Sequence, residues 1–253
     1  MKLSLILCLL GVAITITSCS DHLYAPALHH SDIAYMPKPV LTDTNKSATY
    51  ITGGLVDDGS PNYSDELVSG QLNVSRGHAF DHFNLAYGAF GSFGSYKNSE
   101  LQPQDPYYFK NKFFGAVGGR FSGNAVISTG KVDFRIIGFE AAYSHEFGDY
   151  LRFRREVTDK PGFYTDTRTD LFTLGATTEM VFKSNRLNNQ FGFRIFWGGT
   201  FGDNGYRNKN SDYLYHVYNH GLITAAYFMQ IKNYIAIVEA GYYLSFRLGY
   251  RFK

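Results

Sequence analysis

The last stretch of the chain, residues 236–252, alternates between apolar residues and residues that are mostly polar or small. Val238, Leu244 and Phe252 belong to the apolar set, and Glu239 and Arg247 to the other. A period of two places successive side chains on opposite faces of a β-strand. At ~3.3 Å per residue and a tilt near ~40°, the segment would rise roughly 43 Å, more than the ~25 Å apolar band of an outer-membrane barrel requires. We therefore interpret it as the closing strand of a transmembrane β-barrel.

The N-terminus carries the signals of an exported lipoprotein. A short charged start precedes apolar residues 3–16, and the sequence Ile16-Thr17-Ser18-Cys19 follows. This run is similar to a bacterial lipobox, in which a signal peptidase cuts before a cysteine that carries diacylglyceryl. An ordinary signal peptide with a chance cysteine is the alternative, and the apolar run is shorter than the ~20 residues of a membrane helix. The prediction is a signal peptide over residues 1–18 and a lipid on Cys19.

Cysteine use and composition agree with this class. Of the two cysteines, Cys8 lies in the predicted signal peptide, so a mature chain with lipid on Cys19 forms no internal disulfide. Aromatic residues make up 17% of the chain and charged residues only 18%, below the about 25% charge of soluble domains. The net charge of +2 does not indicate nucleic acid. No cofactor is expected beyond the covalent lipid.

The chain divides into a leader, a tether and a barrel. Residues 19–46 are polar, contain Pro26, Pro37 and Pro39, and show no period, which predicts a disordered lipidated tether. Residues 47–253 are predicted to form one antiparallel up-and-down transmembrane β-barrel, an all-β fold. Period-two segments cover residues 48–56, 67–76, 82–93, 113–122, 132–147, 171–183, 190–201, 221–231 and 236–252.

The number of strands is harder to predict. Bacterial barrels normally close with an even number of strands, and residues 150–157 alternate well enough to supply a tenth. Ten strands are expected, with eight as the alternative. If the last strand ends in the periplasm, the short turn at residues 232–233 lies outside, where such barrels usually place long loops. The orientation is therefore left open.

A family resemblance adds to this interpretation. Cys19, the elements Tyr24-Ala25-Pro26 and Pro37-Lys38-Pro39-Val40, and a first strand near Ala48 resemble the lipid-anchored outer-membrane β-barrel proteins of Bacteroidetes, most of them uncharacterised. The resemblance implies a membrane-spanning, lipid-anchored protein of the outer membrane. The expected partners are outer-membrane lipid, the barrel-assembly machinery during biogenesis and an envelope protein.

Six charged residues on five of the predicted strands are expected to face the lumen. A charge facing lipid near the midplane costs ~2 to 4 kcal/mol, so these side chains favour the interior, where opposite charges pair. The first interpretation is a structural filling of a narrow barrel, and the second is a path or pocket for a small solute. The six residues are Arg120, Glu140, Glu179, Arg194, Glu239 and Arg247.

The function predicted from these features is structural, scaffolding or partner-binding, without enzymatic activity. Tyr107, Tyr108 and Phe109 form a candidate contact surface in a loop, or else part of an interfacial aromatic belt. A narrow pore or ligand carrier is the alternative. A lipid-modifying enzyme is less favoured, because Ser144 and His145 fall on opposite faces of a strand, and no metal site is predicted. A soluble, tethered lipocalin-like barrel would need apolar residues inside.

Overall fold

The computed structural model describes residues 21–41, 43, 45–59, 65–99, 101–184, 189–201, 206–208, 214–215 and 221–252. Within these residues ten strands form a closed barrel, each antiparallel to its neighbours. They follow chain order, and the last strand pairs with the first to close the sheet. The strands are β2 (Ser47–Gly59), β3 (Glu66–Ala79), β4 (Phe83–Lys97), β5 (Lys112–Ser128), β6 (Val132–Gly148), β8 (Asp170–Lys183), β9 (Gln190–Thr200), β12 (Leu222–Ile231), β13 (Tyr234–Ala240) and β14 (Tyr243–Phe252).

The barrel is apolar outside and polar inside. Large apolar side chains such as Leu55, Ile137 and Leu248 remain more than half exposed on the outer face. Buried polar side chains, among them Glu140 and Arg194, point from the same strands into the lumen. This is the polarity of a barrel in lipid, and it contradicts the soluble lipocalin-like alternative, which needs an apolar interior.

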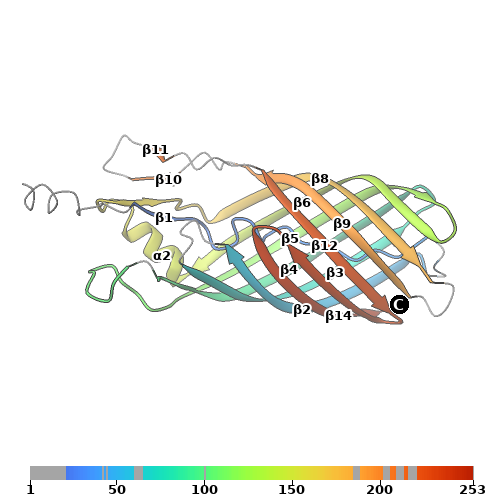
Figure 1. Cartoon of the computed structure of the whole chain (residues 1–253), viewed down its shortest axis with the longest axis horizontal. Helices are drawn as coiled ribbons and strands as arrows, with labels where there is room; N and C mark the ends of the chain where they lie inside the picture. Colours follow the sequence, from blue (N-terminus) through green and yellow to red (C-terminus); the bar gives the residue numbers. More distant parts are fainter. Residues whose placement is uncertain are drawn as a thin grey trace, which may run out of the picture.

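The two ends of the barrel differ in their connections (Figure 1). At the end that holds Phe252, which we call the turn end, the connections are residues 80–82, 129–131, 184–189 and 232–233. At the opposite end, the loop end, the connections include residues 98–111, 149–169 and 201–221. Outer-membrane barrels carry short periplasmic turns and longer outer loops. The apparent conflict over residues 232–233 therefore disappears, because this turn lies beside the C-terminus.

The conflict arose because residues 236–252 are a hairpin and not one strand. β13 ends at Ala240 and β14 begins at Tyr243, with Gly241 and Tyr242 between them. Three residues lie between the last paired positions, Ala240 and Leu244, so the parity is kept and both side chains sit on the outer face. The alternation thus continues through the turn, and the prediction of a single closing strand was wrong.

The predicted strand at residues 150–157 was also wrong. This segment is helix α2 (Asp149–Glu156) at the loop end, which packs Tyr150, Phe153 and Arg154 against the barrel. These positions lie three and four residues apart, on one face of a helix. Asp149 in the first turn and basic residues in the last suit the helix dipole. The total of ten strands is confirmed, but the split of residues 236–252 supplies the tenth.

A small sheet covers part of the loop end. It contains β1 (His22–Tyr24), β7 (Phe163–Thr165), β10 (Tyr206–Arg207) and β11 (Leu214–Tyr215). β1 runs parallel to β7, with His22 opposite Phe163. The start of the described chain is therefore fixed to the connection between β6 and β8.

The segment between β1 and β2 fills the barrel. We call residues 25–41, 43, 45 and 46 the plug. Most of its side chains are buried, and Leu28, Tyr35 and Lys38 are at most 1% exposed. The prediction of a disordered tether is therefore corrected for the described part of residues 19–46. Its prolines lack an N–H group, which reduces the number of buried donors that need partners.

Among the described residues, no helix is long and apolar enough to cross a membrane, a finding that does not bear on β-barrels.

Candidate functional site

All six predicted lumen charges lie inside the barrel. Each of the six side chains is buried. Glu239 is the centre of one group, in which it forms ion pairs with Arg247 and, at 3.6 Å, with Arg194. Arg194 also pairs with Glu140 from β6. Four charges on β6, β9, β13 and β14 thus neutralise one another across the lumen.

Glu179 is the centre of a second group, which joins the wall to the plug. Its carboxylate lies 2.5 Å from Nη1 of Arg135 and 3.5 Å from Nζ of Lys38, and it accepts a hydrogen bond of 2.8 Å from the hydroxyl of Tyr35. Lys38 Nζ also donates to Ser122 Oγ at 2.8 Å. The sequence prediction placed Glu179 in the lumen but missed three of its partners, two of them on the plug.

Arg135 was missed because a β-bulge changes the parity of β6. The register with β8 shifts between Arg135 and Gly138, and Ile136 and Ile137 both face outward. A bulge inserts an extra residue and reverses which face the following positions occupy. The two adjacent isoleucines were the signal in the sequence, because they interrupt the alternation.

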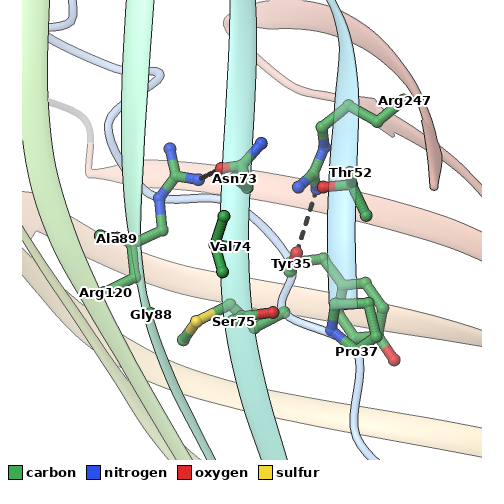
Figure 2. Close-up of a pocket in the computed structure, with 11 residues that line it drawn as sticks. Tyr35, Pro37, Thr52, Asn73, Val74, Ser75, Gly88, Ala89, Arg120 and Arg247 are labelled. Atoms are coloured by element: carbon green, nitrogen blue, oxygen red, sulfur yellow. Dashed lines mark hydrogen bonds between the residues drawn. The ribbon is translucent and has the colours of Figure 1, made fainter. Parts of the chain in front are cut away.

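Arg120 has a different environment from the other wall arginines. Its guanidinium donates to the Asp32 carbonyl at 2.6 Å and to Asn73 Oδ1 at 2.5 Å, and it lies 3.8 Å from the centre of the Phe90 ring. Figure 2 shows Arg120 and Arg247 on either side of a small pocket between plug and wall. The pocket has a volume of about 10 Å³, near the lower limit for one water molecule. It is too small for a solute.

The wall also satisfies the backbone of the plug. Glu146, Glu239 and Asp133 accept hydrogen bonds from three plug amides, and Arg120, Arg247, Arg135, Thr200 and Tyr243 donate to plug carbonyls. An extended segment in a lumen lacks a neighbouring strand, so its buried polar groups need side-chain partners. The charges of the wall therefore serve as the hydrogen-bond partners of the plug.

An aromatic cluster holds the plug at the loop end. The ring of Tyr24 packs edge-on against Phe153, with centroids 5.1 Å apart. Tyr150 donates its hydroxyl to the Ala25 carbonyl at 2.8 Å, and burial raises the pKa of Tyr150 well above its usual value, so it stays a donor. On the same helix, Arg154 forms an ion pair of 2.6 Å with Glu146 of β6. Helix α2 thus fixes the plug through both aromatic and charged contacts.

The predicted aromatic contact surface has a different position from the one expected. Phe109 is buried, and Tyr107 and Tyr108 are partly buried against the same cluster. Phe109 lies 4.6 Å from Phe153, and Tyr107 lies 5.3 Å from Phe163, between ring centroids. The prediction of an exposed run was wrong, because the loop folds back over α2 and buries its aromatic side chains.

His145 is on the outer face, as the alternation predicted. Its Nδ1 atom lies 2.9 Å from Asp170, whose other oxygen accepts from Thr169 at 2.6 Å, whereas Ser144 is buried on the lumen side. In the part of the chain that the structure describes, no serine or cysteine hydrogen-bonds to His145. Nor do the described residues contain a group of three or more His, Cys, Asp or Glu side chains arranged for a metal ion. The lipidation candidate Cys19 lies outside the described residues.

Comparison with known proteins finds similar folds at low identity. No family model matches the chain, and no curated protein does. Among solved structures, the KdgM porin shares 14% identity, with a TM-score of 0.32 over 82% of this chain and 98% of the porin. The transport unit of the autotransporter AIDA-I from Escherichia coli has 10% identity and a TM-score of 0.42, over 89% of this chain and 95% of that one. OprG from Pseudomonas aeruginosa has 10% identity and a TM-score of 0.35, over 82% and 97%.

The assignment as a barrel of the outer-membrane type depends on the chain's own features. These are the closed ring of strand pairs, the apolar outer face and the polar lumen. Closure leaves no strand edge exposed, which is the condition for crossing a bilayer with strands.

Proposed function

We propose that this chain is a lipid-anchored outer-membrane β-barrel with a closed lumen, and that its role is structural or partner-binding at the loop end. The observation that carries the proposal is the plug. Its amides and carbonyls bind wall charges at successive depths, from Glu146 near the loop end to Asp133 near the turn end. A barrel that conducts at rest would need this space free.

Buried ion pairs between plug and wall oppose opening of the lumen. Withdrawing the plug would separate Lys38 from Glu179 and would leave the Glu239 carboxylate without the Tyr35 amide. Hydrogen bonds that involve an ionised group are roughly twice as strong as those between neutral groups. Several such contacts break together when the plug leaves, which favours a permanently filled barrel.

A gated pore is the second candidate, and the polarity of the wall favours it. Arg120, Arg194, Glu140 and Glu239 would line a hydrophilic passage if the plug moved aside. Lumen side chains of this kind set the selectivity of barrels that conduct. The two candidates differ in whether the plug leaves the lumen while the protein functions.

Single-channel recording in planar bilayers tests both candidates. The full chain is expected to give no conductance steps. A lock made by Ser31→Cys with Asp58→Cys, whose side chains are hydrogen-bonded across the plug–wall contact, gives the matched control. Steps in the full chain that disappear when the disulfide forms and return on reduction would establish the pore and overturn the closed barrel.

We also propose that the barrel is not an enzyme. His145 and Asp170 supply a base and an orienting carboxylate on the outer face, but a lipid deacylase also needs a nucleophile within hydrogen-bond reach of the base. The expected result is no release of fatty acid from outer-membrane lipid vesicles. Release that His145→Ala abolishes would contradict this.

Lipid on Cys19 is part of the proposal and has its own test. Metabolic labelling with a radioactive fatty acid should label the mature chain. Cys19→Ala should lose the label, while Cys8→Ala should keep it, because the lipobox resemblance places the acceptor at Cys19. Equal labelling of both variants would rule the anchor out.

A further inference from the structure

The two ends of the plug lie at opposite ends of the barrel. At the turn end, Lys46 accepts a hydrogen bond of 2.7 Å from the Ala79 amide, and Asp43 pairs with Arg251. At the loop end, Tyr24, the residue before the plug, accepts a hydrogen bond of 2.7 Å on its hydroxyl from Asn98. The plug therefore connects the two faces of the barrel.

Contacts between these ends follow the depth of the barrel without reversal. Ser31 contacts Asp58 near the loop end of β2, and the Tyr35 hydroxyl donates to Glu179, well inside β8, at 2.8 Å. Leu41 reaches Asp133, the second residue of β6, at 3.2 Å near the turn end. The chain thus crosses the lumen once.

The start of the described chain is anchored at the loop end. The His22 amide donates to the Gly162 carbonyl at 2.8 Å, and β1 is paired with β7. Figure 1 shows β1 beside α2, at the opposite end from the C-terminus. Asp21, which precedes β1, is exposed. Asp21 therefore lies at the same end of the barrel as the long loops at residues 98–111 and 149–169.

We propose that the mature N-terminus is on the cell surface, reached through the lumen of its own barrel, and that the lipid of Cys19 is inserted in the outer leaflet. This inference depends on the proposed outer-membrane location and lipid anchor. Asp21 follows Cys19 by two positions, a reach of about 7 Å at full extension. The inner leaflet lies beyond an apolar band about 25 Å tall, and the plug fills the direct route. The lipid therefore enters the leaflet on the loop side.

Thiol labelling of intact cells tests the sidedness. The variants Asp21→Cys, Gln104→Cys and Lys131→Cys place exposed thiols before β1, in a long loop and in a turn at the opposite end. The proposed lipid occupies the sulfur of Cys19, so the introduced thiol is the one that reacts. A membrane-impermeant maleimide is expected to label the first two on intact cells and the third only after permeabilisation. If Asp21→Cys is labelled only after permeabilisation, as Lys131→Cys is, while Gln104→Cys is labelled on intact cells, the threading is overturned.

The remaining outcomes are also decisive. If Asp21→Cys and Gln104→Cys are both protected while Lys131→Cys is labelled, the barrel is inverted and surface exposure is overturned. Each variant is first checked for the heat-modifiable gel shift of a folded barrel, so that a misfolded variant is replaced by its neighbour Ser20→Cys, Gln102→Cys or Thr129→Cys. Failure of the closed-lumen proposal would appear as conductance and would leave this labelling pattern unchanged.

A second experiment follows the lipid itself. A specific protease site inserted between Ser20 and Asp21 separates Cys19 from the barrel when it is cut. Adding the protease to intact cells is expected to remove the radioactive fatty acid from the barrel, which stays in the membrane. Retention of the label on intact cells, with loss only after permeabilisation, would place the lipid in the inner leaflet and overturn the proposal.

Discussion

The lumen face of the wall and the plug are both buried and both polar, yet the two regions satisfy their backbone hydrogen bonds in opposite ways. A wall strand such as β3 has paired strands on both sides along its length. The plug is flanked by side chains, and its amides and carbonyls bond to residues such as Glu239 and Arg247. The wall is therefore specified by alternation, whereas the plug is specified by individual contacts.

The largest expected effect comes from removing the charge that serves both regions. Glu239→Gln leaves Arg247 without a carboxylate partner and leaves Arg194 with Glu140 alone, and we expect a loss of about 3–5 kcal/mol in the free energy of unfolding. Urea unfolding in lipid vesicles, followed by the fluorescence of the single tryptophan Trp197, measures it.

Glu66→Gln is the matched control. Glu66 pairs with Lys97 at 2.8 Å, but both side chains are exposed to solvent, and such pairs contribute about 0–1 kcal/mol. Similar losses in the two variants would show that the lumen charges are as well solvated as surface charges, and the contrast between wall and plug would fail.

This contrast explains how much of the fold could be predicted. The lumen positions of Glu140, Glu179 and Arg194 follow from alternation, which a strand imposes on every residue. The plug has no period, so Tyr35 and Lys38 could not be placed, and their partners are far away in the chain. The prolines that suggested a tether are equally suited to a segment that must bury few amides.

The second prediction concerns the outer face of the wall. Leu248→Arg places a charge at the middle of β14, facing lipid, and we expect a loss of about 2–4 kcal/mol in the free energy of unfolding. Leu244→Arg, near the loop end of the same strand, should lose about 0–1 kcal/mol. The same unfolding measurement applies, and equal losses would argue against a bilayer around this strand.

The third prediction removes one contact between plug and wall. Tyr35→Phe deletes the hydroxyl that donates to Glu179 while it keeps the ring stacked on Phe228, 4.4 Å away. A hydrogen bond to a charged group contributes about 1.5–3 kcal/mol, and we expect a loss in that range. Tyr234→Phe, on an exposed ring, should change the free energy of unfolding by less than about 0.5 kcal/mol. No loss in Tyr35→Phe would mean that the plug is not held at this depth.

The smallest expected effect is at the loop end and depends on pH. Tyr150→Phe removes the hydrogen bond to Ala25, with a loss of about 1 kcal/mol at neutral pH. Burial raises the pKa of Tyr150 in the folded state, so its contribution is fully present below the unfolded pKa of about 10 and declines as the pH rises above it. Unfolding at pH 8 and 11 should show a steeper alkaline loss in the natural protein than in Tyr150→Phe. Parallel losses would exclude this tyrosine as the cause.

One wrong prediction at the loop end could have been avoided, because the sequence contains the signal for a helix there. Tyr150, Phe153, Arg154 and Val157 have helical spacing, and they were interpreted as a strand because a short segment fits either period. Other errors had no local cause. Phe109 is buried only because the loop folds onto α2, a contact between distant segments.

The pairing of β14 with β2 has a consequence for the order of assembly. Every other junction in the barrel joins strands that are neighbours along the chain, whereas this one pairs Thr49 with Phe252. Contacts between residues so far apart in sequence close the largest loop and form late in folding. The plug immediately precedes β2 and has its ends on opposite sides of the ring. We therefore expect it to be laid against the open sheet before the last strand docks, so that the final step of folding also traps the N-terminal segment.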